Sequence, residues 1–158
     1  MTDNEGRDRL IAAAREAAGH AYAPYSGYSV GAALLLEDGS IVSGANVENA
    51  SYGLSLCAET VAVAKLANMG RLADVRAVAI VGGRPHDEPS GYDGEPKLVG
   101  AEPVHPCGRC RQMLNEAAEQ ARADVTVICT SGDGGAIATY RLSELLPHSF
   151  GPKDLGLA

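Results

Sequence analysis

Two short cysteine motifs, far apart in the sequence, place the strongest constraint on how this chain can fold. The motifs are Cys57-Ala58-Glu59 and Pro106-Cys107-Gly108-Arg109-Cys110. Together they offer three thiolates for one metal ion, and a carboxylate that is not needed as a ligand. The first and second motifs are separated by about fifty residues, so a fold that uses them must bring two distant segments to one place.

The number of ligands predicts what the metal would do. Zinc with four protein ligands is normally structural, whereas three protein ligands leave one position for water. Glu59, two residues after Cys57, is then placed to move protons to and from that water. We therefore expect a hydrolytic enzyme rather than a module stapled by zinc.

A Cys-x-x-Cys pair alone is weak evidence for a catalytic zinc site, because it is also found in redox sites and in structural zinc sites. A structural site would need a fourth ligand, and the candidates are Cys129 and His105. Cys129 ends an apolar segment and is more simply a small buried hydrophobic residue. His105 directly precedes Pro106, where the short spacing makes it an awkward ligand.

The cysteines stand at predicted helix starts. Cys57 and Cys107 each begin a helix, and Cys110 lies one turn further along the second, on the same face as Cys107. Free backbone N–H groups and the positive end of the helix dipole favour thiolates at such positions. Three thiolates leave zinc with a net negative charge, which Arg109 or Arg111 could offset by hydrogen bonds to sulfur. Either arginine could also be an ordinary solvated charge.

Apolar periodicity predicts an α/β fold: a helix and a hairpin, then alternating helices and strands that form a mixed sheet of about five strands covered by helices. We expect one domain over residues 1–158, with a long loop at about 82–104, where Gly and Pro recur. The expected helices cover residues 8–22, 57–68, 108–120 and 142–145, and the expected strands 28–36, 41–45, 75–81, 125–129 and 136–140.

Composition limits the partners. The 158 residues carry 20 acidic and 13 basic side chains, a net charge of −7, with no basic cluster, so we expect no nucleic-acid partner. No apolar run approaches membrane-spanning length, and the first residues lack a charged-then-apolar leader, so we expect no membrane partner and no secretion. Without secretion, the four cysteines favour metal or redox use over disulfides. We therefore expect a cytoplasmic location.

The two motifs resemble the signature of the zinc-dependent nucleoside deaminases, in the form with Cys as first ligand that is typical of the small, homotetrameric cytidine deaminases. Further segments agree in the same order along the chain: Ala23-Pro24-Tyr25-Ser26, Val30-Gly31-Ala32-Ala33, Asn46-Val47-Glu48-Asn49-Ala50-Ser51-Tyr52 and Glu144-Leu145-Leu146-Pro147. The resemblance implies a three-layer α/β/α arrangement and deamination of cytidine and 2′-deoxycytidine in pyrimidine salvage.

The resemblance also implies roles for single residues. One zinc ion per subunit is bound by Cys57, Cys107 and Cys110, while Glu59 takes a proton from the attacking water and passes it to N3 of the pyrimidine. Asn46 and Glu48 are the implied ribose-binding pair, and the backbone of Ala58 is the implied donor to the pyrimidine carbonyl. Tyr28 would line the base pocket. Three further residues would serve the site of a neighbouring subunit: Ala50, Tyr52 and Phe150.

Two departures from the family pattern bear on charge and substrate. Many similar proteins have Arg directly after the catalytic Glu, where this chain has Thr60, so the resemblance shifts charge balance toward Arg109. Blasticidin deaminases share the segment at 106–112, so an antibiotic or modified cytidine is an alternative substrate. A zinc-binding scaffold without catalysis is the alternative that involves no enzyme.

Overall fold

One mixed sheet organises the chain. The computed structural model describes residues 4–86 and 97–157. The main path of the sheet has strand order β2-β1-β3-β5-β6, with β4 paired to β3. Pairing is antiparallel except between β3 and β5, which run parallel. The strands are β1 (Ser29–Leu36), β2 (Ile41–Ala45), β3 (Val75–Pro85), β4 (Leu98–Val99), β5 (Thr126–Ser131) and β6 (Ile137–Arg141).

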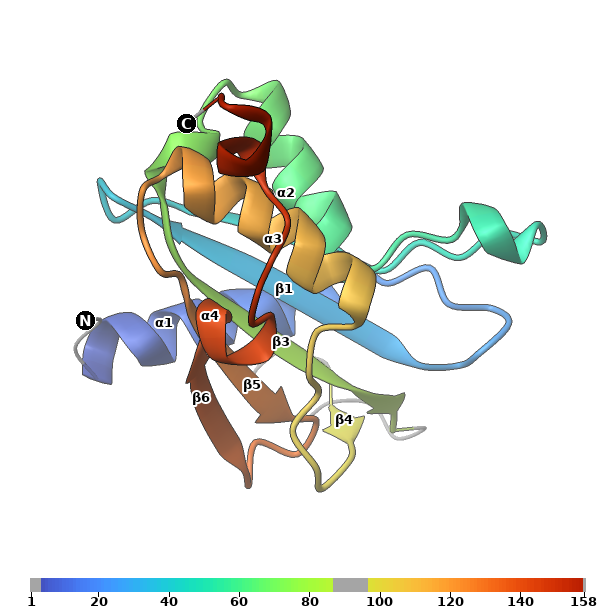
Figure 1. Cartoon of the computed structure of the whole chain (residues 1–158). Helices are drawn as coiled ribbons and strands as arrows, with labels where there is room; N and C mark the ends of the chain where they lie inside the picture. Colours follow the sequence, from blue (N-terminus) through green and yellow to red (C-terminus); the bar gives the residue numbers. More distant parts are fainter. Residues whose placement is uncertain (1–3, 87–96, 158) are drawn as a thin grey trace.

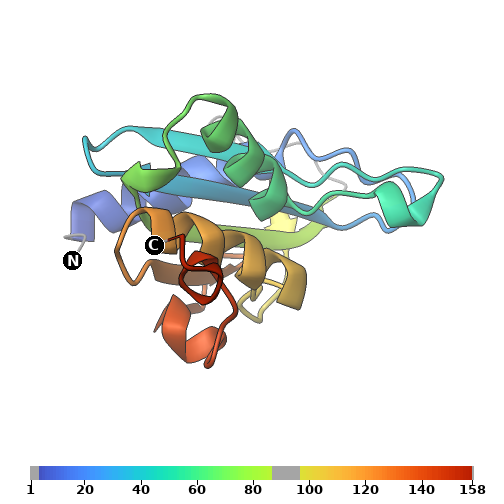
Figure 2. The ribbon, with the colours of Figure 1, turned by 45° about the horizontal axis from the view of Figure 1, so that its top comes forward.

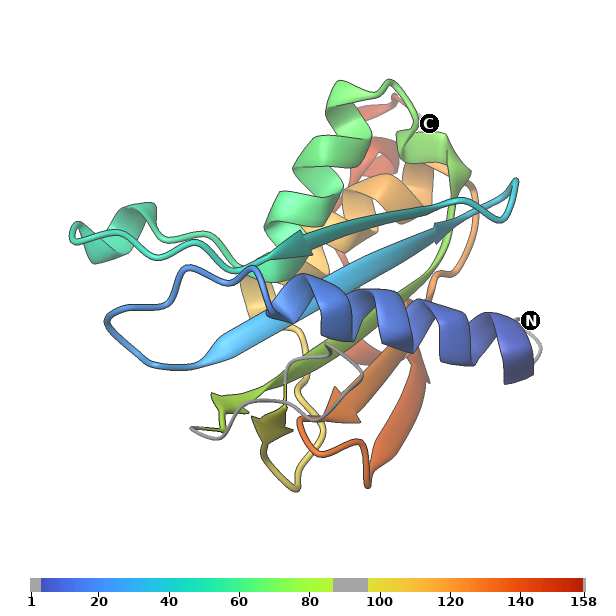
Figure 3. The ribbon, with the colours of Figure 1, turned by 180° about the vertical axis from the view of Figure 1, so that it is seen from behind.

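Helices cover both faces of this sheet, which confirms the three-layer α/β/α prediction. Helix α1 packs on β1, β2 and β3 from one side (Figure 3). Helices α2 and α3 pack against each other and against the opposite face (Figure 1). The helices are α1 (Asn4–Ala18), α2 (Ala58–Asn68), α3 (Gly108–Gln120) and α4 (Leu142–Leu145), with short 3-10 turns at Tyr52–Leu54, Leu72–Asp74 and Pro152–Leu155.

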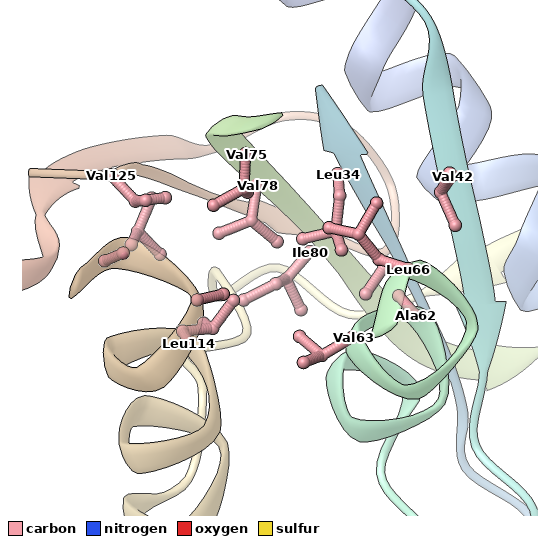
Figure 4. Packing of buried hydrophobic residues seen from close by; sticks show 14 of the residues in the cluster. Leu34, Val42, Ala62, Val63, Leu66, Val75, Val78, Ile80, Leu114 and Val125 are labelled. Carbon is pink, nitrogen blue, oxygen red and sulfur yellow. The ribbon is translucent and has the colours of Figure 1, made fainter. Parts of the chain in front are cut away.

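Alternation along the central strand divides the core in two. Val78 and Ile80 of β3 pack in the larger cluster beneath α2 and α3, where Leu66 and Leu114 meet them (Figure 4). The intervening residues of β3 join the smaller cluster beneath α1, as successive strand side chains point to opposite faces. Each fully buried Leu or Ile contributes about 1.5–3 kcal/mol relative to exposure. The two clusters fix both helical layers against one sheet.

The predicted loop at 82–104 is corrected at both ends. Strand β3 continues to Pro85, and Leu98–Val99 forms β4 beside it. Gly83, which the predicted loop would treat as a turn residue, instead permits close approach of two backbone segments. A Cβ at this position would lie 2.6 Å from the Val99 carbonyl oxygen. The prediction for residues 87–96 lies outside the described residues.

The first helix is also displaced from its predicted span. It begins at Asn4 and ends at Ala18, where Gly19 continues into a turn. Tyr22, predicted as helical, instead pairs with Val47 in an isolated β-bridge. The helix also includes polar residues before position 8. The prediction missed them because the apolar stripe alone does not define where a helix begins.

A projecting arm, residues 46–56, joins β2 to α2. It extends well beyond the sheet and carries the 3-10 turn at Tyr52–Leu54 (Figure 2). The arm is closed at its base by an antiparallel bridge between Val47 and Leu56. In the described parts of the chain, we found no helix that is long and apolar enough to cross a membrane.

Candidate active site

The site is built where two helices begin. Cys57 is the N-cap residue of α2 and Cys107 that of α3, and both have extended backbone conformations. Neither cysteine side chain makes a capping hydrogen bond to its helix. Both helices begin at the end of the molecule from which the arm projects (Figure 1). Cys110 lies in the first turn of α3, so the predicted placement of all three cysteines is confirmed.

The three sulfur atoms fit a single zinc ion. The Sγ atoms of Cys57, Cys107 and Cys110 all lie within 4.8 Å of one another. Those of Cys57 and Cys107 are 3.9 Å apart. Tetrahedral zinc with bonds of about 2.3 Å to sulfur separates its ligands by about 3.8 Å. Cys110 is fully buried whereas Cys107 is exposed, so the cluster has a protein side and a solvent side.

A fourth protein ligand is not found at this cluster among the described residues. Cys129 is buried in β5, and burial raises the pKa of its thiol to about 12, with the Glu59 carboxylate acting in the same direction. His105 instead places Nε2 at 3.1 Å from the Tyr140 hydroxyl. The arrangement therefore has the three ligands of a catalytic zinc site, rather than the four of a structural one.

Without metal, the sulfur atoms share protons unequally. Hydrogen bonding from Cys110, and more weakly from Cys107, lowers the pKa of Cys57 to about 6, and the positive charge of Arg109 acts in the same direction. Hydrogen bonding to Cys57 raises the pKa of Cys110, and burial adds to this effect. Of these two thiols, Cys57 therefore ionises more readily than Cys110.

Glu59 lies beside the cluster in a nearly dry environment. Its residue is only 4% exposed, in the first turn of α2. Burial raises the pKa of the Glu59 carboxyl, and the charge of Cys57 raises it further. A carboxyl group with a raised pKa holds a proton more readily than an ordinary carboxyl group and can pass it on to a base. The structure therefore provides a proton-transfer group next to the predicted metal ligands.

The charged and polar residues around the sulfur atoms differ from expectation. Arg109 is exposed and acts on Cys57 through its charge. Arg111, a candidate for hydrogen bonding to sulfur, instead donates to the carbonyl oxygens of Pro106 and Leu145, each at 2.9 Å. Sequence reasoning treated Thr60 only as a missing arginine. Its position directly after Glu59, in the first turn of α2, is the signal that could have indicated a role for Thr60 in the site.

The predicted ribose-binding residues lie at the base of the arm, and both are hydrogen-bonded to backbone groups in residues 25–30, which lead into β1. Asn46 Oδ1 accepts a hydrogen bond from the Val30 amide, and Nδ2 donates to the Tyr28 carbonyl, each at 2.9 Å. One Glu48 oxygen accepts from the amides of Tyr25 and Ser26 at 2.9 and 3.1 Å. Asn46 therefore also holds the backbone of residues 28–30 in place.

Glu48 also faces a hollow between the arm and this loop. The hollow has a volume of about 270 Å³ and is lined by Tyr25, Ser26, Glu48, Tyr52 and Ser55. Hydrogen bonds from Ser26 and from the backbone amides lower the pKa of Glu48, so its carboxylate is held ionised. An ionised carboxylate in a small open hollow can accept hydrogen bonds from hydroxyl groups.

The other predicted contacts fall into two groups. Ala58 is buried at the start of α2, where first-turn N–H groups have no partner within the helix, and the half-buried Tyr28 packs its ring against Gly82. Ala50, Tyr52 and Phe150 are exposed instead, with Tyr52 73% and Phe150 61% accessible. The last three residues therefore present their side chains outward from this subunit.

Phe150 is displayed by contacts that the sequence did not reveal. Its carbonyl oxygen accepts hydrogen bonds from Gln112 Nε2 at 2.9 Å and Asn115 Nδ2 at 3.3 Å, both on α3. Gly151 is buried next to Asn115 and Glu119, where a Cβ would lie 2.6 Å from the Glu119 carboxylate. The helix that carries Cys110 thus also fixes the segment that carries Phe150.

Three cysteine ligands beside a buried carboxyl group are typical of zinc hydrolases that activate water. Both helix starts bring these groups together at one edge of the sheet. A family model described as the cytidine and deoxycytidylate deaminase zinc-binding region matches residues 4–127. A cytidine deaminase from Halalkalibacterium halodurans is 42% identical over 149 residues, covering 94% of this chain and 97% of the relative. The chain therefore belongs to the cytidine and deoxycytidylate deaminase family.

Other relatives agree along nearly the whole chain. A cytidine deaminase from Mycobacterium tuberculosis is 39% identical over 142 residues, covering 90% of this chain and 87% of the relative. The crystal structure of the cytidine deaminase from Burkholderia pseudomallei is similar with a TM-score of 0.73 and 37% identity, covering 95% of this chain and all of that chain. The predicted family, fold and zinc cofactor are confirmed.

Proposed function

We infer that this protein is a zinc-dependent hydrolase that deaminates cytidine and 2′-deoxycytidine to the corresponding uridines. The observation that carries this inference is the convergence of three cysteine sulfur atoms beside a buried carboxyl group, in a chain whose relatives are named cytidine deaminases. The names of these relatives favour cytidine over an antibiotic nucleoside. The buried carboxyl group beside a three-ligand cluster argues against a scaffold that only binds zinc.

Cys57, Cys107 and Cys110 would hold the zinc ion, which would supply the acidity that makes water a nucleophile near neutral pH. Glu59 accepts a proton from the attacking water and delivers it to N3 of the pyrimidine. It then assists the departure of ammonia from C4, so that water and cytidine become uridine and ammonia. The low exposure and the raised pKa of Glu59 support this role, since the group must release the proton it takes.

The substrate residues follow the same site. We propose that the Ala58 amide donates to the pyrimidine carbonyl, as an N–H group free at the start of a helix can do. Tyr28 borders the base, and the free oxygen of Glu48 accepts from ribose hydroxyls in the hollow beside the arm. Asn46 contributes to the ribose contact with the second lone pair of its Oδ1 and the second N–H of its Nδ2, because the Val30 amide and the Tyr28 carbonyl already occupy one of each.

A substrate panel tests the proposed activity. The purified zinc-loaded protein is incubated with cytidine, 2′-deoxycytidine, 5-methylcytidine and blasticidin S, and the loss of the aminopyrimidine absorbance is followed. We expect turnover of cytidine and 2′-deoxycytidine. Turnover of blasticidin S without turnover of cytidine would overturn the assigned substrate, and no turnover of any of them would support a scaffold.

We also propose a homotetramer in which sites are shared between subunits. The supporting observation is that the arm and the C-terminal segment expose large apolar side chains, among them Tyr52, Leu54 and Phe150 at 73, 66 and 61% accessibility. Tyr52 and Leu54 lie close in sequence on the projecting arm, and exposed apolar side chains grouped in this way mark sites of protein–protein interaction. Phe150, Ala50 and Tyr52 would each reach the site of a neighbouring subunit.

Mixed assemblies test the shared site. We expect Glu59→Gln and Phe150→Ala subunits each to be inactive or impaired alone, whereas a mixed tetramer would contain neighbouring pairs with an intact Glu59 and an intact Phe150. We expect activity to rise when the two variants are unfolded, mixed and refolded together. Activity that stays at the average of the separate variants would contradict shared sites. Sedimentation velocity measures the number of subunits independently.

The place of the reaction follows from its chemistry and from the cysteines. We propose a cytoplasmic enzyme of pyrimidine salvage that acts on free nucleosides. All four cysteines are free thiols, and three of them gather in the metal cluster, which suits a reducing compartment. The acidic balance supports a small nucleoside rather than a nucleic acid as the partner.

A further inference from the structure

Thr60 reaches from one of the helices of the active site to a metal ligand on the other. Its Oγ1 lies 3.7 Å from the Sγ of Cys110, within hydrogen-bonding distance for sulfur. Thr60 belongs to the first turn of α2, whereas Cys110 belongs to the first turn of α3. Both residues are buried, with Thr60 only 6% exposed and Cys110 fully enclosed. The contact therefore joins the two helix starts on the side of the cluster away from solvent.

The contact acquires a direction when the metal is bound. A thiol can donate or accept, so either atom could donate in the metal-free protein. A cysteine that binds zinc is a thiolate and can only accept. The Thr60 hydroxyl must then be the donor. Threonine hydroxyls in helices often bond instead to a carbonyl of the preceding turn.

Three thiolates make this hydrogen bond consequential. They leave a zinc site with one net negative charge, and each hydrogen bond to a sulfur reduces the charge that it donates to the metal. Arg109 is exposed, whereas Cys110 is fully buried. The Thr60 hydroxyl supplies a neutral donor at this buried ligand, and its hydrogen bond to sulfur offsets the cost of burying the hydroxyl.

We propose that Thr60 is a positioning residue of the metal centre, whose hydroxyl donates to the Cys110 thiolate, fixes its orientation and withdraws part of its charge. A neutral donor thus serves the buried ligand of the cluster. This inference deepens the proposed function and rests on the same metal site, but it does not depend on the identity of the substrate.

Cobalt(II) in place of zinc gives a readout that does not involve turnover. The energy of the charge-transfer band from sulfur to cobalt reports how strongly the thiolates donate. Thr60→Val keeps the shape of the side chain and removes the hydroxyl, so we expect the band to move to longer wavelength. Thr60→Ser retains the hydroxyl and should leave the band at the parent position. Thr60→Ala, a second variant without the hydroxyl, should behave as Thr60→Val does.

Thr130→Val is the matched control. Thr130 is 1% exposed in β5, and its hydroxyl has no hydrogen-bond partner among the described residues. We expect this substitution to leave the cobalt spectrum unchanged. A band that does not move in Thr60→Val and Thr60→Ala, or that moves equally in Thr60→Ser, would overturn the proposal.

The zinc-loaded enzyme provides the second readout. A stronger thiolate makes the metal less acidic, so the acidic limb of the pH profile of kcat should move to higher pH in Thr60→Val. We expect kcat/KM to fall roughly 10- to 100-fold, as for other residues that orient metal ligands, and Thr60→Ser to recover most of the loss. A fall in activity without any movement of the pH profile would indicate a purely structural role. If cytidine proves not to be the substrate, the cobalt spectra still decide the question.

Discussion

Gly44 determines how closely the helix that carries Glu59 can approach the sheet. A Cβ added at this position of β2 would lie 2.6 Å from the Ala62 amide nitrogen and 2.8 Å from the Ala58 carbonyl oxygen. Ordinary van der Waals contact for a Cβ begins near 3.4 Å, so the shortfall against the helix backbone is about 0.8 Å. Backbone atoms cannot rotate aside as a side chain can. Gly44→Ala should therefore push the first turns of α2 away from the sheet.

The displacement has two measurable effects. Forcing an additional methyl group into a packed interior costs about 1–3 kcal/mol, so the free energy of unfolding of the metal-free protein should fall by that amount in urea titrations. A shift of nearly 1 Å also moves Cys57 and Glu59 relative to the cysteines on α3. Because misplacement by about 1 Å can lower a rate roughly 100-fold, we expect kcat/KM to fall by one to two orders of magnitude. Zinc affinity, measured by competition with a chromogenic chelator, should fall as well.

Ile128→Val separates these effects. Ile128 is buried in the cluster beneath α1, on the opposite face of the sheet, and its truncation costs about 0.5–1.5 kcal/mol. This variant should lose stability but keep its zinc affinity and its rate. If Gly44→Ala lost stability while zinc affinity and kcat/KM stayed at parent values, or if Ile128→Val lost them equally, the reasoning about α2 would be refuted.

Three further substitutions test other parts of the site. Glu59→Gln should retain zinc and lower kcat by roughly 10²–10⁴-fold. Because burial raises the pKa of the Glu59 carboxyl in the folded protein above its ordinary value of 4.5, ionisation at pH 7 opposes folding. The metal-free variant should therefore be more stable than the parent at pH 7, with the gain vanishing below about pH 4.5. Asn46→Asp replaces an amide donor by a negative charge that faces the Tyr28 carbonyl oxygen, so urea titrations should show the free energy of unfolding lowered by about 1–3 kcal/mol. Asn49→Asp is the control, because it keeps the side-chain oxygen that accepts from the Ser51 amide, and it should change little in the same titrations. Arg111→Met removes two hydrogen bonds from a cation to carbonyl oxygens and should cost about 1.5–3 kcal/mol, with faster hydrogen exchange in residues 145–151; unchanged exchange would argue against its role in holding that segment.

The sequence predicted the elements whose signals are local. The helix at 108–120, the short helix at 142–145 and the strand at 41–45 were predicted with their observed bounds. The placement of the cysteines at helix starts was also correct, because an apolar stripe follows each motif. These features depend on neighbours within one or two turns, and such neighbours are visible in a single sequence.

What failed depends on contacts between distant segments. Gly82 and Gly83 suggest a turn when read locally, yet they lie in β3, where Val99 and Val104 pack directly over them. Whether a glycine breaks a strand or admits a close neighbour is decided by what lies against it in space. Thr60 illustrates the same limit within the site. Its importance follows from the approach of α3 to α2, which the sequence alone does not show.

The two ligand cysteines at N-cap positions make folding depend on the metal supply. An ordinary N-cap side chain stabilises its helix by about 0.5–2 kcal/mol, and neither Cys57 nor Cys107 makes that hydrogen bond. Zinc bound only by the folded chain adds stability that grows with the logarithm of its free concentration, reaching about 4.1 kcal/mol at 1,000 times the dissociation constant. A chain that acquires no ion therefore keeps two weakened helix ends and spends more time partly open. Proteolysis in the cell would then remove metal-free copies preferentially, so that the enzyme population remaining is enriched in copies able to work.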